Sequence, residues 1–193
     1  MKEDVLEQIV DDHLKADGYF TMHNVRFRPR PDSAGYDKRA DSSPSDIDVI
    51  GIGPRKSGPP RVKVVTCKSW QNGFDASWWA ANVSLNTRIA GRPCWKFFRE
   101  LVVQRWAESF MAKIEEMTGT REFTYVTAVT KLRGDRKAWE LNPALQRKID
   151  GNPIEILTLE EIYAAFATDD STTPAASEIG RLVQLLKAAQ LLE

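Results

Sequence analysis

Two short apolar segments joined by a turn-forming linker constrain the fold more than any other feature of the sequence. Asp46–Ile52 (DIDVIGI) and Arg61–Ser69 (RVKVVTCKS) are rich in β-branched residues, as strands are. The linker between them, GPRKSGPP, consists largely of residues that favour turns. The sequence therefore predicts two neighbouring strands joined as a β-hairpin.

Other segments with strand or helix patterns surround this hairpin. Further strands are expected at Tyr19–Arg28, Phe123–Thr130 and Ile154–Leu157. The expected helices are Lys2–Ala16, Asp75–Ile89, Cys94–Met117, Arg136–Ile149 with a break at Pro143, Leu159–Ala167, and a last helix capped by Ser177. The polar segment Pro29–Ser45 is expected to be an exposed loop. This order predicts an α/β fold with a mixed central β-sheet flanked by helices.

The length of the chain favours one domain. At 193 residues it can bury one core but is short for two. We expect a single domain over residues 1–193, with a core at about 1–130 and a C-terminal helical extension at about 158–193. The last helix carries an apolar stripe that is expected to pack on the domain or on a partner, and it comprises Ile179, Leu182, Val183, Leu186 and Ala189.

The apolar content of the chain also bears on its location. No apolar run approaches the roughly 20 residues that span a bilayer. The acidic, amphipathic start, MKEDVLEQIVDD, does not resemble a signal peptide. The sequence thus predicts a cytoplasmic protein without a membrane partner.

Composition limits the ligands that the chain is expected to bind. Two cysteines and two histidines give no disulfide framework and no zinc-site spacing. A metal would therefore be held by oxygen ligands, which favours Mg²⁺ or Mn²⁺. No phosphate-cradling glycine loop opens a helix, so no nucleotide cofactor is expected. The net charge is zero, but Thr21–Trp70 holds ten Lys and Arg against five Asp. This local excess fits a phosphate-facing edge and fits solvated loops equally.

The first hairpin strand carries two carboxylates among its apolar residues. Side chains alternate across a strand, so Asp46 and Asp48 are expected on one face. Ile47 and Val49 are expected on the other face.

On the second hairpin strand, Thr66 and Lys68 share a face in the same way. If the two strands pair, Asp48 and Lys68 can converge on one spot. A carboxylate and an ammonium group on neighbouring strands of an apolar sheet are costly unless they are paired or used. Two interpretations stay open from the residues alone: a catalytic site, and a salt bridge or a solvated strand end.

The segments from the first helix to the end of the hairpin resemble the core of the PD-(D/E)XK nuclease superfamily, which includes restriction endonucleases, Mrr-type enzymes and Holliday-junction resolvases. The resemblance rests on a helix with Glu7, a strand with Asp48 (DIDVIGI), a turn, and a strand that ends in Cys-Lys-Ser (VKVVTCKSW), over about residues 1–75. It implies that Asp48 binds a metal, that Lys68 is the catalytic lysine, and that Glu7 adds an acid to the metal site. It further implies a Mg²⁺- or Mn²⁺-dependent endonuclease that hydrolyses DNA phosphodiester bonds in restriction or genome defence, with a homodimer by analogy.

One residue departs from the pattern of the superfamily. The motif has Asp or Glu two residues before the lysine, and this chain has Thr66, whose hydroxyl is a weak, neutral ligand. Asp46 is the first substitute, in a catalytic and metal-binding role, because it is expected to share a strand face with the metal-binding aspartate. Glu7 and Asp75 come next, and Gln71 could add an amide oxygen. The alternative is a catalytically inactive nuclease-like module that binds DNA or a partner.

Arginines and tryptophans near the hairpin are candidates for DNA contact. Arg26, Arg28 and Arg30 would line one face if the strand continues, where they could follow a phosphate backbone or protect an edge strand. Three tryptophans after the lysine could stack on bases or pack in the core, and they are Trp70, Trp78 and Trp79.

Overall fold

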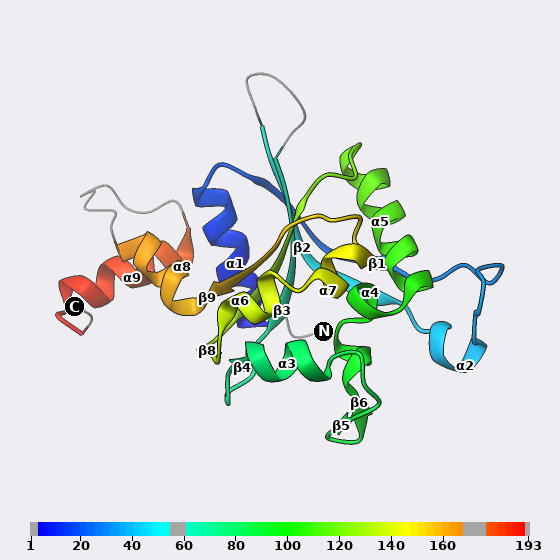
Figure 1. Ribbon diagram of the computed structural model, residues 1–193. Helices are drawn as coiled ribbons and strands as arrows, with labels where there is room; N and C mark the ends of the chain where they lie inside the picture. Colours follow the sequence, from blue (N-terminus) through cyan, green and yellow to red (C-terminus); the bar gives the residue numbers. More distant parts are fainter. Residues whose placement is uncertain (1–3, 55–60, 168–176, 192–193) are drawn as a thin grey trace.

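The structure, a computed structural model, describes residues 4–54, 61–167 and 177–191. Within these ranges a five-stranded sheet forms the centre of the molecule (Figure 1), in the order β1-β2-β3-β7-β9. The strands are β1 (Phe20–Phe27), β2 (Ser45–Gly53), β3 (Arg61–Lys68), β7 (Thr124–Val129) and β9 (Ile154–Thr158). The pairs β1–β2 and β2–β3 are antiparallel, and β3–β7 and β7–β9 are parallel. The predicted mixed central sheet is confirmed, and β9 carries it beyond the expected core at about 1–130.

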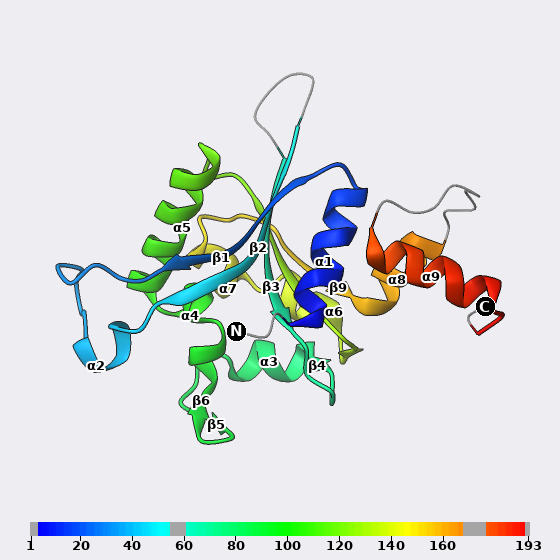
Figure 2. The ribbon, with the colours of Figure 1, turned by 180° about the vertical axis from the view of Figure 1, so that it is seen from behind.

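Helices lie on both sides of the sheet, as the two opposite views show (Figures 1 and 2). One side holds α1 (Val5–Ala16), α8 (Leu159–Ala167) and α9 (Glu178–Ala188). The other side holds α3 (Ala76–Asn82), α4 (Arg99–Val102), α5 (Gln104–Thr118), α6 (Arg136–Glu140) and α7 (Pro143–Lys148). Pro143 begins α7, so the break expected at this residue is present. In the described residues, no helix combines the length and the apolar character needed to cross a membrane.

The two faces of the sheet have different cores. Under α1, aliphatic side chains dominate, with Leu6, Val10 and Leu14 against Val49 and Val65. The core under α3 to α7 is rich in aromatic rings, among them Phe98, Trp106, Phe110, Tyr125 and Trp139. This aromatic core surrounds the face of the sheet on which the candidate site lies.

The segment predicted as one helix, Cys94–Met117, is divided in three. A short 3₁₀ helix η1 (Cys94–Phe97) precedes α4 and α5. The backbone leaves the helical conformation at Phe98 (φ −145°, ψ 55°) and at Val103 (φ −101°, ψ 118°). The Phe98 side chain is fully buried in the aromatic core, so tertiary packing overrides local helix propensity here.

The helix predicted at Asp75–Ile89 ends early, at Asn82. After it, β5 (Arg88–Ile89) and β6 (Arg92–Pro93) form a small hairpin. Its turn has left-handed backbone at Ala90 (φ 48°) and Gly91 (φ 79°), which a helix cannot accommodate. A second pair of short strands, β4 (Phe74–Asp75) and β8 (Leu132–Arg133), joins the start of α3 to the segment after β7.

The segment Pro29–Ser45 is largely exposed, as expected, but it is not all loop and it is anchored at one point. It contains the short helix α2 (Lys38–Asp41), whose Asp41 is fully buried. The Asp41 carboxylate accepts hydrogen bonds from Arg105 Nε at 2.6 Å and from Trp106 Nε1 at 2.7 Å. Burial alone would raise the pKa of Asp41, but these bonds outweigh burial and lower it. The segment is therefore held against α5 by an ionised carboxylate.

Candidate functional site

The pairing of β1 with β2 is interrupted at Asn24, which lies opposite Asp48 and has left-handed backbone (φ 52°). The register is the same on both sides of this point, but the side chains of β2 change sides there. Ile47 is buried in the aromatic core, and Val49 is buried in the core under α1. The prediction that these two residues share a face, with Asp46 and Asp48 on the opposite one, is therefore wrong.

Asp48, Thr66 and Lys68 form a hydrogen-bonded chain across β2 and β3. Asp48 Oδ2 accepts from the backbone N–H of Cys67 at 2.6 Å and from the Thr66 hydroxyl at 3.4 Å. Lys68 Nζ donates to Thr66 Oγ1 at 2.8 Å. Because both side-chain bonds meet at this Oγ1, Lys68 Nζ and Asp48 Oδ2 are at most about 6.2 Å apart. The structure thus brings the two expected catalytic residues together.

A second acid, Glu100 of α4, lies on the same side of the sheet. Its side chain is buried, and its Oε1 accepts a hydrogen bond from the hydroxyl of Tyr125 on β7. Glu100 is close enough to Lys68 and Asp48 for both to influence its pKa, and Tyr125 also interacts with Thr66. The polar group therefore draws on three strands and one helix.

Both acids of this group have raised pKa values. Burial raises the pKa of Asp48, and Lys68 and the hydrogen bonds from Cys67 and Thr66 offset part of that rise. Burial also raises the pKa of Glu100, against the hydrogen bond from Tyr125 and the attraction of Lys68. Two carboxylates thus share one ammonium group in a partly buried site, so an added cation would favour their ionised forms.

The donors of this group are the oxygen ligands that Mg²⁺ and Mn²⁺ prefer. In the part of the chain that the structure describes, no group of three or more His, Cys, Asp or Glu side chains is placed to hold a metal ion. Mg²⁺ is commonly bound through one or two carboxylates, with substrate phosphates and water completing its shell. Asp48 and Glu100 supply two carboxylates on one side of the sheet, and among the described residues they do not belong to a closed protein cage.

Glu100 and Tyr125 were not among the residues singled out from the sequence. Glu100 was hidden in a long expected helix, where one more acid is ordinary. The signal that could have found it is its setting in FFRELVV, where an acid is surrounded by apolar residues. Tyr125 is two residues from both Phe123 and Thr127, so the three side chains share one strand face. All three are buried, and a buried hydroxyl needs a hydrogen-bond partner.

The other predicted acids have different surroundings. Asp46 keeps 37% of its side chain exposed and pairs with Arg26 at 3.6 Å. It is still close enough to contribute to the raised pKa of Asp48. Glu7 lies on α1, where it contributes, after burial and Asp48, to the raised pKa of the Cys67 thiol.

The candidates that follow β3 have other positions. Asp75 caps α3, because its Oδ1 accepts from the backbone N–H of Trp78 at 2.9 Å. Gln71 is exposed in the turn after β3. Neither the acid nor the amide takes part in the chain that links Asp48 to Lys68.

The three arginines expected to contact DNA are exposed at the edge of the sheet. β1 ends at Phe27, so Arg26, Arg28 and Arg30 do not continue along one strand face. Arg26 pairs with Asp46, and Arg30 pairs with Asp32 at 2.9 Å. These pairs neutralise part of the positive charge at this edge.

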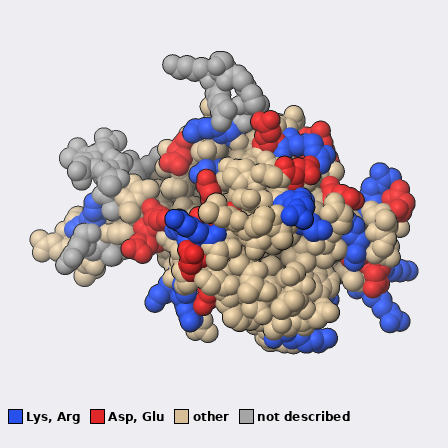
Figure 3. Space-filling view, in the orientation of Figure 1, with Lys and Arg blue, Asp and Glu red and all other residues tan. Residues whose placement is uncertain are grey.

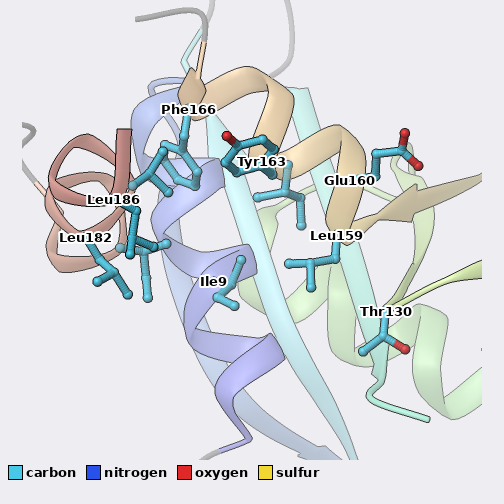
Figure 4. Close-up of a pocket in the computed structure, with 11 residues that line it drawn as sticks. Ile9, Thr130, Leu159, Glu160, Tyr163, Phe166, Leu182 and Leu186 are labelled. Atoms are coloured by element: carbon cyan, nitrogen blue, oxygen red, sulfur yellow. The ribbon is translucent and has the colours of Figure 1, made fainter. Parts of the chain in front are cut away.

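An apolar groove lies on the opposite side of the sheet, between α1, α8 and α9 (Figure 4). It has a volume of about 410 Å³. The stripe predicted on the last helix takes part in it, since Ile179, Leu182, Val183 and Leu186 all line it. The stripe therefore packs on the domain, although Leu182 remains 50% exposed.

Comparison with known proteins gives no family for the chain. No protein-family model matches it, and no curated protein matches its sequence. A crystal structure described as a "Protein of Unknown Function AF1548" is similar over 97% of this chain and 79% of its own, with 14% sequence identity and a TM-score of 0.40. A likeness this distant indicates neither a family nor an activity.

Proposed function

We propose that this chain is a metal-dependent nuclease that hydrolyses DNA phosphodiester bonds, with a site centred on Asp48 and Lys68. The observation that supports it most is the convergence of these two residues, through the hydroxyl of Thr66, on adjacent strands of a largely apolar sheet. Ionisable groups whose pKa values are perturbed by burial beside a charged partner are frequent at catalytic sites. The resemblance to PD-(D/E)XK nucleases, the homodimer, the cytoplasmic location and a role in restriction or genome defence belong to this proposal.

The residues of the site have distinct roles in this proposal. Asp48 would hold Mg²⁺ or Mn²⁺, and this cation would supply Lewis-acid polarisation of the phosphate and activation of a water molecule. Lys68 Nζ neutralises charge that develops on the phosphate oxygens, and Thr66 holds this ammonium group in place. The Phe98 ring, whose centroid lies 5.1 Å from Lys68 Nζ, makes a cation–π contact that helps to hold the lysine in position.

Glu100 is the acid that we assign in place of the motif residue replaced by Thr66. It is buried on the same side of the sheet as Lys68, whereas Asp46 points toward Arg26. A buried carboxylate with a raised pKa is costly to ionise, and binding of a cation would offset that cost. Tyr125 orients the Glu100 carboxylate toward the site.

A second candidate function is DNA binding without cleavage. It is favoured by Thr66, which supplies a neutral hydroxyl where the motif has a charged ligand. The described residues also hold no group of three or more side chains placed to bind a metal. In this case Asp48 and Lys68 serve as a partly buried polar link between two strands.

Cleavage of supercoiled plasmid in the presence of Mg²⁺ or Mn²⁺ separates the two functions. For the nuclease, Asp48→Asn and Lys68→Met should each lower the rate by at least about a hundredfold, and Glu100→Gln should be comparably damaging. Asp46→Asn is the matched control, because it removes the same charge from the same strand and should retain most of the activity. An inactive wild type that binds DNA would favour the second function. Loss of activity in Asp46→Asn with retention in Glu100→Gln would reverse the assignment of the second acid.

A further inference from the structure

An aromatic pocket opens beside the candidate site, at the end of the sheet where α3 and the β5–β6 hairpin lie (Figure 1). Its volume is about 460 Å³, within the roughly 300–1,000 Å³ typical of small-ligand pockets. Most of its wall is apolar or aromatic, and its lining includes Trp70, Trp78, Trp79, Phe97, Asn72 and Asp75.

The rings of the aromatic pocket pack against one another and give a flat guest an aromatic surface to stack on. Trp70 and Trp79 are stacked, with centroids 5.0 Å apart and planes 26° apart. Trp78 and Phe97 stand across Trp79 as side walls, at interplanar angles of 87° and 70°. Trp79 is buried, whereas Trp78 is 37% exposed. Packing in the core therefore accounts for Trp79, but it does not account for the exposed face of Trp78.

Positive charge flanks the aromatic pocket on two sides. The Arg92 guanidinium lies 4.8 Å from the Phe97 centroid, and Arg133 donates to the backbone carbonyl of Asn72 at 3.3 Å. Both arginines are exposed, and neither has a carboxylate within ion-pair distance among the described residues. At this end of the molecule, Figure 3 shows a broad uncharged surface with a few Lys and Arg side chains along its lower edge. A guest that combines a flat ring with negative charge fits both features.

The aromatic pocket and the site are neighbours, because the buried Phe98 ring, which does not itself line the pocket, contacts both Lys68 and the pocket residue Trp79. Phe98 lies 5.1 Å from Lys68 Nζ, and its centroid is 5.3 Å from that of Trp79. The separation between Lys68 Nζ and the Trp79 centroid is therefore at most about 10.4 Å. A nucleotide chain whose phosphate lies at Lys68 can place a neighbouring base in the pocket.

We infer that the aromatic pocket binds an unpaired base of a DNA strand, so that the substrate is single-stranded or locally unpaired DNA. This inference rests on the proposed nuclease function and specifies its substrate. A base stacked in a duplex cannot enter the aromatic pocket, because it must first leave the stack. The rings take up the base, Asn72 can bond to its edge, and Arg92 and Arg133 bind the adjoining phosphates.

Binding measured without divalent metal tests the pocket independently of cleavage. The probes are a fluorescein-labelled oligothymidylate, a strand of equal length built from abasic residues, and a duplex of the same length. The abasic strand keeps the phosphates and lacks the bases, so the wild type should bind it, and the duplex, at least about tenfold more weakly than oligothymidylate. Equal affinity for the abasic strand and oligothymidylate would overturn the inference, since binding would then depend on phosphates alone.

Trp78→Ala identifies the pocket as the place where the base binds. It should weaken oligothymidylate binding by about tenfold and remove the difference from the abasic strand. Trp95→Ala is the matched control, because Trp95 is half-buried on η1 and does not line the pocket. A Trp78→Ala protein that binds like Trp95→Ala would refute the assignment. If Trp78→Ala does not fold, the wild-type comparison of the two strands still decides. Base-dependent binding without any cleavage would support base binding in the aromatic pocket and would contradict the proposed nuclease activity.

Discussion

Replacement of Glu100 by glutamine tests whether this buried acid lowers the unfolding free energy of the protein while it contributes to the proposed cleavage reaction. Glutamine keeps the shape and an acceptor for the Tyr125 hydroxyl, but it removes a carboxylate whose pKa burial raises. Leaving a buried polar group incompletely compensated costs on the order of 1–3 kcal/mol. The variant should therefore gain about that much unfolding free energy at alkaline pH. One kcal/mol corresponds to about 2–4 °C in Tm for a chain of this size, so the Tm should rise by about 2–12 °C.

The pH dependence of this gain follows from the direction of the shift. The folded-state pKa of Glu100 lies above its ordinary value of 4.5, so the folded protein holds this proton more tightly than the unfolded chain. The associated stability is complete below the unfolded pKa and is lost as the pH rises through the folded pKa. The difference between Glu100→Gln and wild type should be small in acid and should grow with pH.

Thermal unfolding followed by circular dichroism over a pH series measures this difference. Glu108→Gln is the matched control, because Glu108 is an exposed acid on α5 and its loss should leave the Tm nearly unchanged at every pH. Cleavage by the Glu100→Gln protein should fall while its Tm rises. A variant that is less stable than wild type at alkaline pH, or whose gain is the same in acid and alkali, would refute the reasoning.

Three further outcomes follow from the structure. Asp41→Ala should lower the unfolding free energy by about 3–5 kcal/mol in chemical denaturation, because Arg105 loses its buried carboxylate partner. Asp32→Ala is the control: it breaks an exposed ion pair and should cost at most about 1 kcal/mol. Gly73→Ala should destabilise the protein more than Gly119→Ala, although both glycines have positive φ. A Cβ at Gly73 would meet the backbone oxygen of Lys131 at 2.8 Å, whereas no described atom lies within 4 Å of a Cβ at Gly119. Equal losses of unfolding free energy in the two variants would contradict this. The cleavage rate should rise with pH as Asp48 loses its proton, because the pKa of this carboxyl is raised. A higher Mg²⁺ concentration should move the rise to lower pH, because the metal binds the ionised carboxylate. A cleavage rate that does not change with pH would show that ionisation of Asp48 does not control the reaction.

The sheet and the pair Asp48–Lys68 could be predicted because the relevant signals are local. The strand pattern and the turn residues of the linker predicted that the two strands pair, and β2 and β3 are indeed antiparallel neighbours. Residues 55–60 of the linker, on which the turn prediction falls, lie outside the described residues. The parallel strands β7 and β9 were recognisable by their β-branched residues. Each of these features depends on residues near one another in the chain.

The position of Asp46 could not be predicted, because it depends on a neighbouring strand. Alternation within β2 places Asp46 beside Asp48, and the left-handed backbone at Asn24 of β1 coincides with the change of sides. Glu100 was missed for a related reason. The break at Phe98 that separates α4 from the preceding turn comes from burial of the ring in a core assembled by distant segments. Local patterns contain neither event.

The buried carboxylate of Asp41 also gives the protein a built-in spectroscopic probe. Among the described tryptophans, Trp106 donates its indole N–H to a carboxylate, whereas Trp139 donates to the neutral hydroxyl of Thr127. A charge-assisted bond of this kind is shorter and stronger than a neutral one. The Trp106 indole proton should resonate apart from the other indole signals and exchange slowly with solvent. Its NMR signal therefore reports whether α2 is docked on α5, and this makes detachment of the β1–β2 connection observable without a label.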